Sequence, residues 1–162
     1  MIRTATAADL DAIAALHRRA RATYYEGHIP EEAYAGEAEL ARTRAGWSAA
    51  VARPDGMVLC AERDGRLAGV AAFRTDAEGT TLTQLHVDPD QWRRGTGTAL
   101  HEACVTAWRR AGITRARLEV YEHNLRAQAF YAHHGWRPDP AAPVRSGSHR
   151  TLWLTVAPPP TE

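Results

Sequence analysis

The chain has 162 residues, of which 44% are hydrophobic and 24% charged, a composition typical of a single globular domain with a buried core. Its 20 basic and 19 acidic residues nearly cancel, leaving a formal net charge of +1. Bulk charge therefore gives no reason to expect nucleic acid or an anionic membrane as a partner. Every basic residue is an arginine, and the absence of lysine excludes phosphate-loop nucleotide hydrolases and Schiff-base enzymes.

The terminal residues of the chain lead to expectations about the cellular location of the protein and the bounds of its domain. The first residues are polar and charged, unlike a signal peptide, and no apolar run approaches the ~18 residues of a membrane span. We therefore expect a cytoplasmic protein without a membrane partner. Residues 1–157 are expected to form one domain, and the proline-rich residues 158–162 a flexible tail.

The first third of the chain is mostly helical in its spacing. A short alternating segment at 2–6 predicts a strand, and apolar residues at helical spacing predict a helix over 10–24. Gly27 and Pro30 end this helix. A second helical stretch covers about 40–51.

The period then changes to that of strands. Apolar runs at 57–62 and 67–73 flank the turn residues Asp64 and Gly65, which predicts a hairpin. A further strand is expected at 80–87.

The remaining elements alternate between helix and strand. A helix opens at about Thr98 and ends before Gly112, and a strand covers 115–120. A last helix is followed by terminal strands, one of them at 151–156. This order predicts a single mixed α/β domain.

The segment before the helix at Thr98 has the residues of a phosphate site. Arg93, Arg94, Gly95 and Gly97 precede a helix start, where free N–H groups and the helix dipole attract an anion. The glycines let the backbone come close to phosphate oxygens, and the arginines add positive charge. A surface turn before a helix is the alternative. A dinucleotide fingerprint fits worse, because leucine stands where its third glycine is needed.

A second informative segment begins at Asn124, the only asparagine of the chain, which stands where a helix needs a cap. Tyr131 follows seven residues later on the same helical face, near the C-terminal end of the helix. Taken alone, this segment is accounted for by a capped amphipathic helix with an aromatic core residue.

Together, the two segments resemble the GCN5-related N-acetyltransferase (GNAT) superfamily. Residues 93–100, Arg-Arg-Gly-Thr-Gly-Thr-Ala-Leu, are similar to its acyl-CoA pyrophosphate loop, and residues 124–136, Asn-x-x-Ala-x-x-Phe-Tyr-x-x-x-Gly-Trp, to its second motif. The resemblance covers residues 2 to about 156. It implies the GNAT fold, a mostly antiparallel twisted sheet of six to seven strands with flanking helices, splayed at its middle strands.

The resemblance also implies a function of the bacterial small-molecule type. A primary amine would attack the acetyl group of acetyl-CoA directly, without a metal, and Tyr131 would donate a proton to the leaving sulfur. The residues that would bind acetyl-CoA are Leu85, His86, Val87, Arg93, Arg94, Gly95, Thr96, Gly97, Thr98, Asn124, Ala127 and Tyr131.

Two positions depart from the family's pattern. Trp92 occupies the first position of its Gln/Arg-x-x-Gly-x-Gly motif, and Thr81 stands where many relatives carry a glutamate. The general base therefore stays open. A water relay is one candidate, and the others are Glu26, His86, Glu119 and His123.

The loop at 24–30 resembles the acceptor-side loop of bacterial small-molecule members. Tyr25, Glu26 and His28 are the expected substrate-binding residues, and residues 138–150 would form the other wall. The expected partner is a small-molecule amine, and a homodimer is compatible with the chain. Two alternatives stay open, namely acetylation of protein N-termini or side chains, and an acyl-CoA-binding module without turnover.

Overall fold

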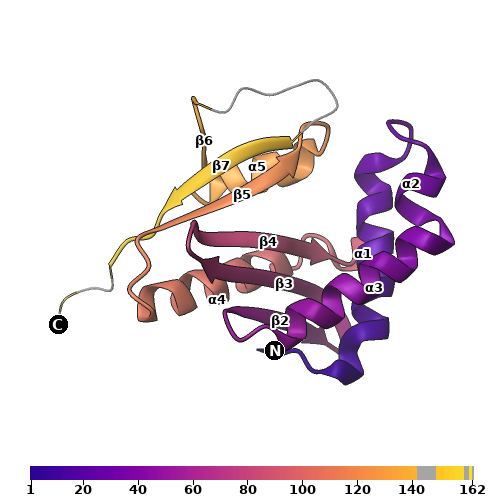
Figure 1. Cartoon of the computed structure of the whole chain (residues 1–162), viewed down its shortest axis with the longest axis horizontal. Helices are drawn as coiled ribbons and strands as arrows, with labels where there is room; N and C mark the ends of the chain where they lie inside the picture. The colour runs from indigo at the N-terminus through magenta and orange to yellow at the C-terminus, as the bar shows by residue number, and fades with distance from the viewer. Residues whose placement is uncertain (142–148, 159–160, 162) are drawn as a thin grey trace.

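The computed structural model describes residues 1–141, 149–158 and 161 (Figure 1). One seven-stranded sheet in the order β1-β2-β3-β4-β5-β7-β6 forms its centre. Its neighbouring strands are antiparallel except for β4 and β5, so the expected fold class is confirmed. The strands are β1 (Ile2–Thr4), β2 (Gly56–Arg63), β3 (Arg66–Asp76), β4 (Gly79–Val87), β5 (Arg115–Tyr121), β6 (Arg137–Pro138) and β7 (His149–Thr155).

Helices cover both faces of the sheet. One face of β2 and β3 packs against α1 and α3, and α4 packs against the other face (Figure 1). The short helix α2 and the two-residue strand β6 are not predicted from the sequence, because elements of this length show no periodicity. The helices are α1 (Leu10–Tyr25), α2 (Glu31–Ala35), α3 (Glu37–Ala52), α4 (Thr96–Arg110) and α5 (Leu125–His133).

The central strands are buried on both faces. On β2, Val58 and Cys60 pack into the core beneath α1 and α3, whereas Leu59 and Ala61 pack into the core beneath α4. Successive side chains of a strand point to opposite faces. A strand covered on both sides therefore shows the continuous apolar run seen in the sequence rather than alternation.

β4 and β5 separate along most of their length. In the described part of the chain, the register joins only residues 80–81 of β4 to residues 116–117 of β5, although the strands continue to Val87 and Tyr121. Thr83 is the extra residue of a β-bulge opposite β3. A bulge bends its strand and increases its twist, so β4 diverges from β5 at this point. The expected splay of the middle strands follows from this divergence.

Two expectations fall partly outside the described residues. The tail expected at 158–162 includes 159–160 and 162, and the wall expected at 138–150 includes 142–148.

Candidate active site

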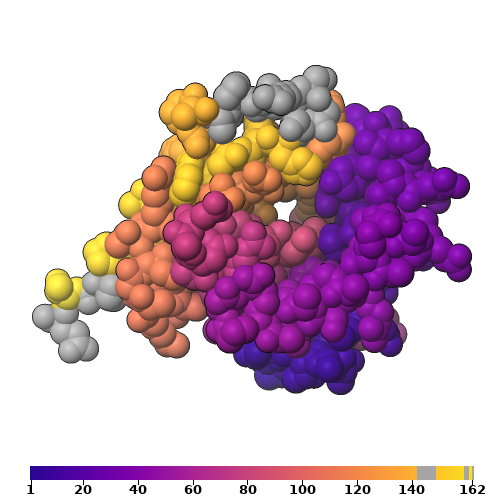
Figure 2. All heavy atoms as spheres, in the orientation of Figure 1, coloured from indigo at the N-terminus to yellow at the C-terminus, as the bar shows by residue number. Residues whose placement is uncertain are grey.

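A cavity of about 720 Å³ occupies the opening between β4 and β5. Its lining comes from α1, β4, the loop before α4, β5 and α5. The space-filling view shows the hollow passing between the β4–β5 region and α1, with a hole open to the far side (Figure 2). The cavity is therefore open toward both faces of the sheet.

The N-terminus of α4 forms one end of this cavity. The helix begins at Thr96, two residues before the expected start, directly after Gly95 in the left-handed conformation (φ 77°). Its first helical bond joins the Ala99 N–H to the Gly95 carbonyl at 3.0 Å. The N–H groups of Thr96, Gly97 and Thr98 therefore have no helical acceptor, and together with the helix dipole they offer a site for an anion.

The loop is shaped to let its backbone approach a ligand closely. A Cβ atom at Gly97 would lie 3.2 Å from the ring of Phe130, so a side chain here would crowd the cavity. Arg93 adopts a left-handed backbone (φ 64°), which is costly for a residue other than glycine. The Arg63 guanidinium donates to the Arg94 carbonyl at 2.9 Å and holds the loop. These residues fit the pyrophosphate of coenzyme A.

β4 presents its main chain to the cavity beyond the bulge. Leu85, His86 and Val87 line the cavity, on the edge of β4 that has diverged from β5. Free main-chain groups on a strand edge can bond to an extended ligand as a neighbouring strand would. The three residues expected beside the pantetheine arm therefore lie next to residues 93–98, the expected phosphate-binding segment, which is called the phosphate loop below.

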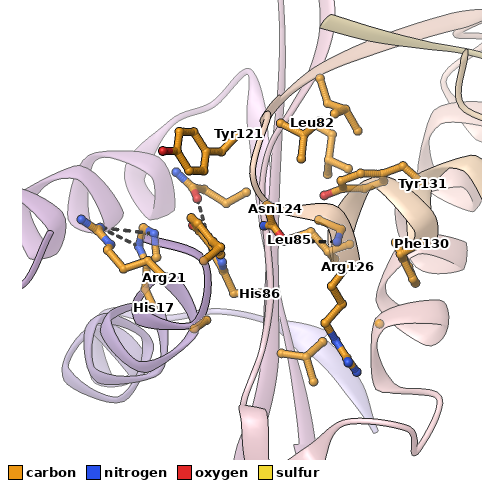
Figure 3. A pocket seen from close by; sticks show the side chains of 18 of the residues that line it. His17, Arg21, Leu82, Leu85, His86, Tyr121, Asn124, Arg126, Phe130 and Tyr131 are labelled. Carbon is orange, nitrogen blue, oxygen red and sulfur yellow. Dashed lines mark hydrogen bonds between the residues drawn. The ribbon is translucent and has the colours of Figure 1, made fainter. Parts of the chain in front are cut away.

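The helix α5 and its cap residue supply the facing wall. Asn124 caps the helix, its Oδ1 accepting a hydrogen bond from the Ala127 N–H at 3.2 Å, as expected. Tyr131 projects its phenol toward the gap between β4 and β5, on the side of Leu82 and Asn124 (Figure 3). Burial raises the pKa of Tyr131 above its ordinary value, so the phenol keeps its proton at neutral pH.

The expected binding residues do not all reach the cavity. Among the described residues, Arg94 is the member of the acetyl-CoA set that stays outside the lining. Of the acceptor set, Tyr25 lines the cavity and Glu26 and His28 do not. The physical reason is that α1 ends at Tyr25, after which His28 turns aside and stacks on the ring of His123 at 4.3 Å.

Two of the four candidate bases line the cavity, namely His86 and Glu119, whereas Glu26 and His123 lie outside its described lining. His86 Nε2 lies 2.6 Å from Gln84 Oε1. Because an amide oxygen only accepts, Nε2 carries the proton of a neutral ring. Burial lowers the pKa of His86 to about 3, which makes it a weak base.

His17 and Arg21 line the cavity without having been assigned to the site from the sequence. They lie four residues apart on the buried face of α1, where the helical pattern indicates core. Trp47 Nε1 donates to His17 Nδ1 at 3.0 Å, and Arg21 pairs with Glu39 at 2.9 Å. The sequence feature that could have identified them is the presence of two polar residues on an otherwise apolar helix face.

Trp92, which departs from the family's motif, contacts Arg126 of α5. The Arg126 guanidinium lies 3.6 Å from the centre of the indole ring, in a cation–π contact. Both residues line the cavity, and Arg126 extends along its wall (Figure 3). A positive charge from α5 therefore lies beside the phosphate loop.

Residues 1–141, 149–158 and 161 contain no group of three or more His, Cys, Asp or Glu side chains placed to hold a metal ion. None of their helices is both long and apolar enough to cross a bilayer.

Solved structures of acetyltransferases share this fold. PaiA N-acetyltransferase from Thermoplasma acidophilum, in complex with coenzyme A, superimposes with a TM-score of 0.75 at 21% identity, covering 96% of this chain and 98% of that one. The ribosomal-protein-S18-alanine N-acetyltransferase from Escherichia coli has a TM-score of 0.72 at 21% identity, covering 97% and 94%. At such identities the likeness establishes the fold.

The sequence is also similar to proteins named as acetyltransferases. An uncharacterised N-acetyltransferase of Mycobacterium bovis is 35% identical over 100 residues, which cover 59% of this chain and 62% of that protein. A mycothiol acetyltransferase of Clavibacter sepedonicus is 32% identical over 133 residues, covering 82% of this chain and 41% of that protein. The chain therefore spans less than two thirds of either relative. The profile of the acetyltransferase (GNAT) family matches residues 13–136, which include both the phosphate loop and Tyr131, and the chain belongs to this family.

Proposed function

We propose that the protein transfers an acetyl group from acetyl-CoA to a primary amine of a small molecule, by direct attack of the amine on the thioester. The proposal rests on one observation. The N-terminus of α4, the free edge of β4 and the Tyr131 phenol all face one cavity. A diphosphate, an extended arm and a reacting thioester require these three features. The names of the relatives, N-acetyltransferase and mycothiol acetyltransferase, support the same chemistry.

The binding roles follow from the free polar groups of the cavity. The N–H groups of Thr96, Gly97 and Thr98 bind the pyrophosphate. Main-chain groups of residues 85–87 pair with the pantetheine arm. Asn124 uses its Oδ1 for the helix cap, which leaves its amide N–H groups as donors to the arm.

The reaction forms one N–C bond and breaks one C–S bond. The amine loses a proton, the sulfur leaves as a thiolate that takes a proton from solvent, and coenzyme A ends as a thiol. A thiol has a pKa near ~8.5, well below that of a buried tyrosine, so full proton transfer from Tyr131 is uphill. Tyr131 therefore acts as a hydrogen-bond donor to the sulfur as charge develops on it. A main-chain N–H of residues 85–87 stabilises the carbonyl oxygen in the same step.

The proton lost by the amine goes to water or to Glu119. Glu119 is an exposed carboxylate in the cavity lining and can pass a proton to solvent. His86 is the weaker choice, because its pKa of about 3 makes it a poor proton acceptor at neutral pH.

A protein acceptor is the second candidate, because one structure with this fold is a ribosomal-protein-alanine N-acetyltransferase. An acyl-CoA-binding module without turnover is the third, and the Tyr131 phenol in the cavity argues against it. We expect the protein to act in the cytoplasm as a single domain over residues 1–157, alone or as a homodimer.

Thiol release from acetyl-CoA tests this function. The purified chain is offered amino acids, polyamines, aminoglycosides and amine-bearing natural products, and each product is checked by mass for one added acetyl group. We expect release with at least one class. Tight binding of coenzyme A with no release from any amine would favour a binding module. An added acetyl group on cell proteins only would favour the protein acceptor.

A further inference from the structure

Three polar residues form a row across the sheet at the closed end of the opening. The register pairs Thr81 of β4 with Arg74 of β3 and with Arg117 of β5. Paired residues of neighbouring strands point to the same face. All three line the cavity. Two guanidinium groups therefore flank the position at which many relatives carry a glutamate.

The side chains of this row lie on the face of the sheet opposite α4. Leu82 and Leu118, the next residues along their strands, pack into the core beneath α4. Because neighbours on a strand alternate, Thr81 and Arg117 point to the opposite face of the sheet, the face of α1. Tyr121 lies on the same face of β5, where its ring is 4.8 Å from that of Tyr25. An acceptor that enters from this face meets the row.

Arg117 has no carboxylate partner among the described residues. Its Nε donates to Thr81 Oγ1 over a long 3.4 Å. Arg74 contacts the half-exposed Asp76 over 3.4 Å, too far for a tight ion pair. Within residues 1–141, 149–158 and 161, the cavity wall therefore offers a guanidinium with no carboxylate partner, whose terminal donors can bind an anion.

Glu119 adds the opposite charge two residues further along β5. It lines the cavity on the same face as Arg117, and its main chain pairs with Thr151 of β7, whereas its carboxylate has no hydrogen bond or ion pair within the described residues. Continuing the β4–β5 register past the bulge places it across from Gln84, where the strands have opened. From the closed end toward the open centre, β5 thus presents a cation and then an anion.

We propose, resting on the function above, that the acceptor is a small aminocarboxylate. Arg117, assisted by Arg74, binds its carboxylate, and Glu119 attracts its ammonium group toward the thioester. The fork of a guanidinium matches a carboxylate through two parallel hydrogen bonds. The order of charges along β5 also aligns the amine with the open centre rather than with the closed end.

The test offers L-amino acids beside their α-amides and their decarboxylated amines. Thiol release measures turnover, and calorimetry measures binding of the same compounds to the protein saturated with coenzyme A. We expect the acid to be preferred over its amide by about 10- to 100-fold in kcat/KM or Kd. Arg117→Gln should remove most of this preference and leave the KM for acetyl-CoA unchanged.

Arg115→Gln is the matched control. Arg115 lies on the same strand but its guanidinium stacks 3.7 Å from the centre of the Trp153 ring, outside the cavity lining, so the preference should stay at the wild-type value. Acids bound and acetylated no better than amides, or a preference that survives Arg117→Gln, would overturn the inference while leaving the acetyltransferase function standing. Acids preferred in binding without thiol release from any amine would support the inference and refute that function. Failure of every compound to bind or react would refute the aminocarboxylate class.

Discussion

The rings of His17 and His86 stack in the cavity, with centres 4.1 Å apart and planes inclined by 28°. Trp47 donates to Nδ1 of His17, so this nitrogen carries no proton, whereas His86 donates from Nε2 to Gln84 and is kept neutral by burial. Burial lowers the pKa of His17 to about 2 and that of His86 to about 3, and the nearby Arg21 charge adds to both shifts. The stack therefore packs as two neutral aromatic rings at physiological pH.

Stability should fall as the pH drops below 6.5. His101 of α4 is a third buried, neutral histidine. Trp136 Nε1 donates to its Nε2 at 2.9 Å, and burial lowers its pKa to about 4. These folded-state pKa values lie below the ordinary value, so the unfolded chain binds the protons more strongly. The stabilisation is complete above pH 6.5 and is lost progressively below it, down to about pH 4 for His101, 3 for His86 and 2 for His17, by at most about 1.4 kcal/mol per pH unit for each histidine. Thermal melting across this range measures it.

Two variants test whether the buried histidines cause this pH dependence of stability. His86→Gln should reduce the slope of Tm against pH, because it removes one of the buried rings. The exposed His133→Gln should keep the slope of the parent chain. A Tm that stays constant from pH 6.5 to 4.5 would contradict the neutral assignment of the buried histidines.

Removing the Tyr131 hydroxyl should slow turnover without weakening cofactor binding. In Tyr131→Phe the leaving sulfur loses its donor, so we expect kcat to fall about 100-fold, with little change in the Kd of acetyl-CoA. Tyr34→Phe, which alters a buried tyrosine of α2 outside the cavity lining, should keep the parent rate. An unchanged kcat for Tyr131→Phe across the pH range would exclude Tyr131 from the reaction.

A side chain at Gly97 should abolish coenzyme A binding. Gly97→Glu places a carboxylate in the phosphate site and a Cβ 3.2 Å from Phe130. Gly46→Glu adds the same side chain on the exposed side of α3, where nothing lies within 4 Å of a new Cβ, and should bind like the parent. Calorimetry with coenzyme A distinguishes them, and retained micromolar binding by Gly97→Glu would show that the phosphates bind elsewhere.

The Arg126 guanidinium should strengthen binding through its charge. We expect Arg126→Gln to raise the Kd of coenzyme A about 3- to 10-fold at low ionic strength, and the difference should shrink as salt screens the charge. Arg110→Gln, in the last turn of α4, removes an equal charge far from the loop. Equal losses in the two variants would mean that net charge, not the contact on Trp92, is responsible.

Local pattern was sufficient for much of the fold and for part of the site. The hairpin of β2 and β3, the helix α4 and the cap at Asn124 depend on residues close together in the chain, and each is found within a few residues of its predicted position. The same kind of local pattern predicts a phosphate site in the loop before α4. By contrast, Glu26 and His28 are expected in the site because their loop resembles the family's acceptor-side loop, but α1 ends at Tyr25 and neither residue lines the cavity.

The sequence by itself determined which segments become helices and strands and which loop can hold a phosphate, because these properties depend on side chains and backbone preferences within a few residues. Only the tertiary structure decided that His17 meets His86, and that Arg74 and Arg117 flank Thr81. Those contacts depend on strand register and on the bulge at Thr83, which pulls β4 away from β5 and opens the cavity. The β4–β5 register joins segments that lie far apart in the chain, so no pattern within a few residues encodes it.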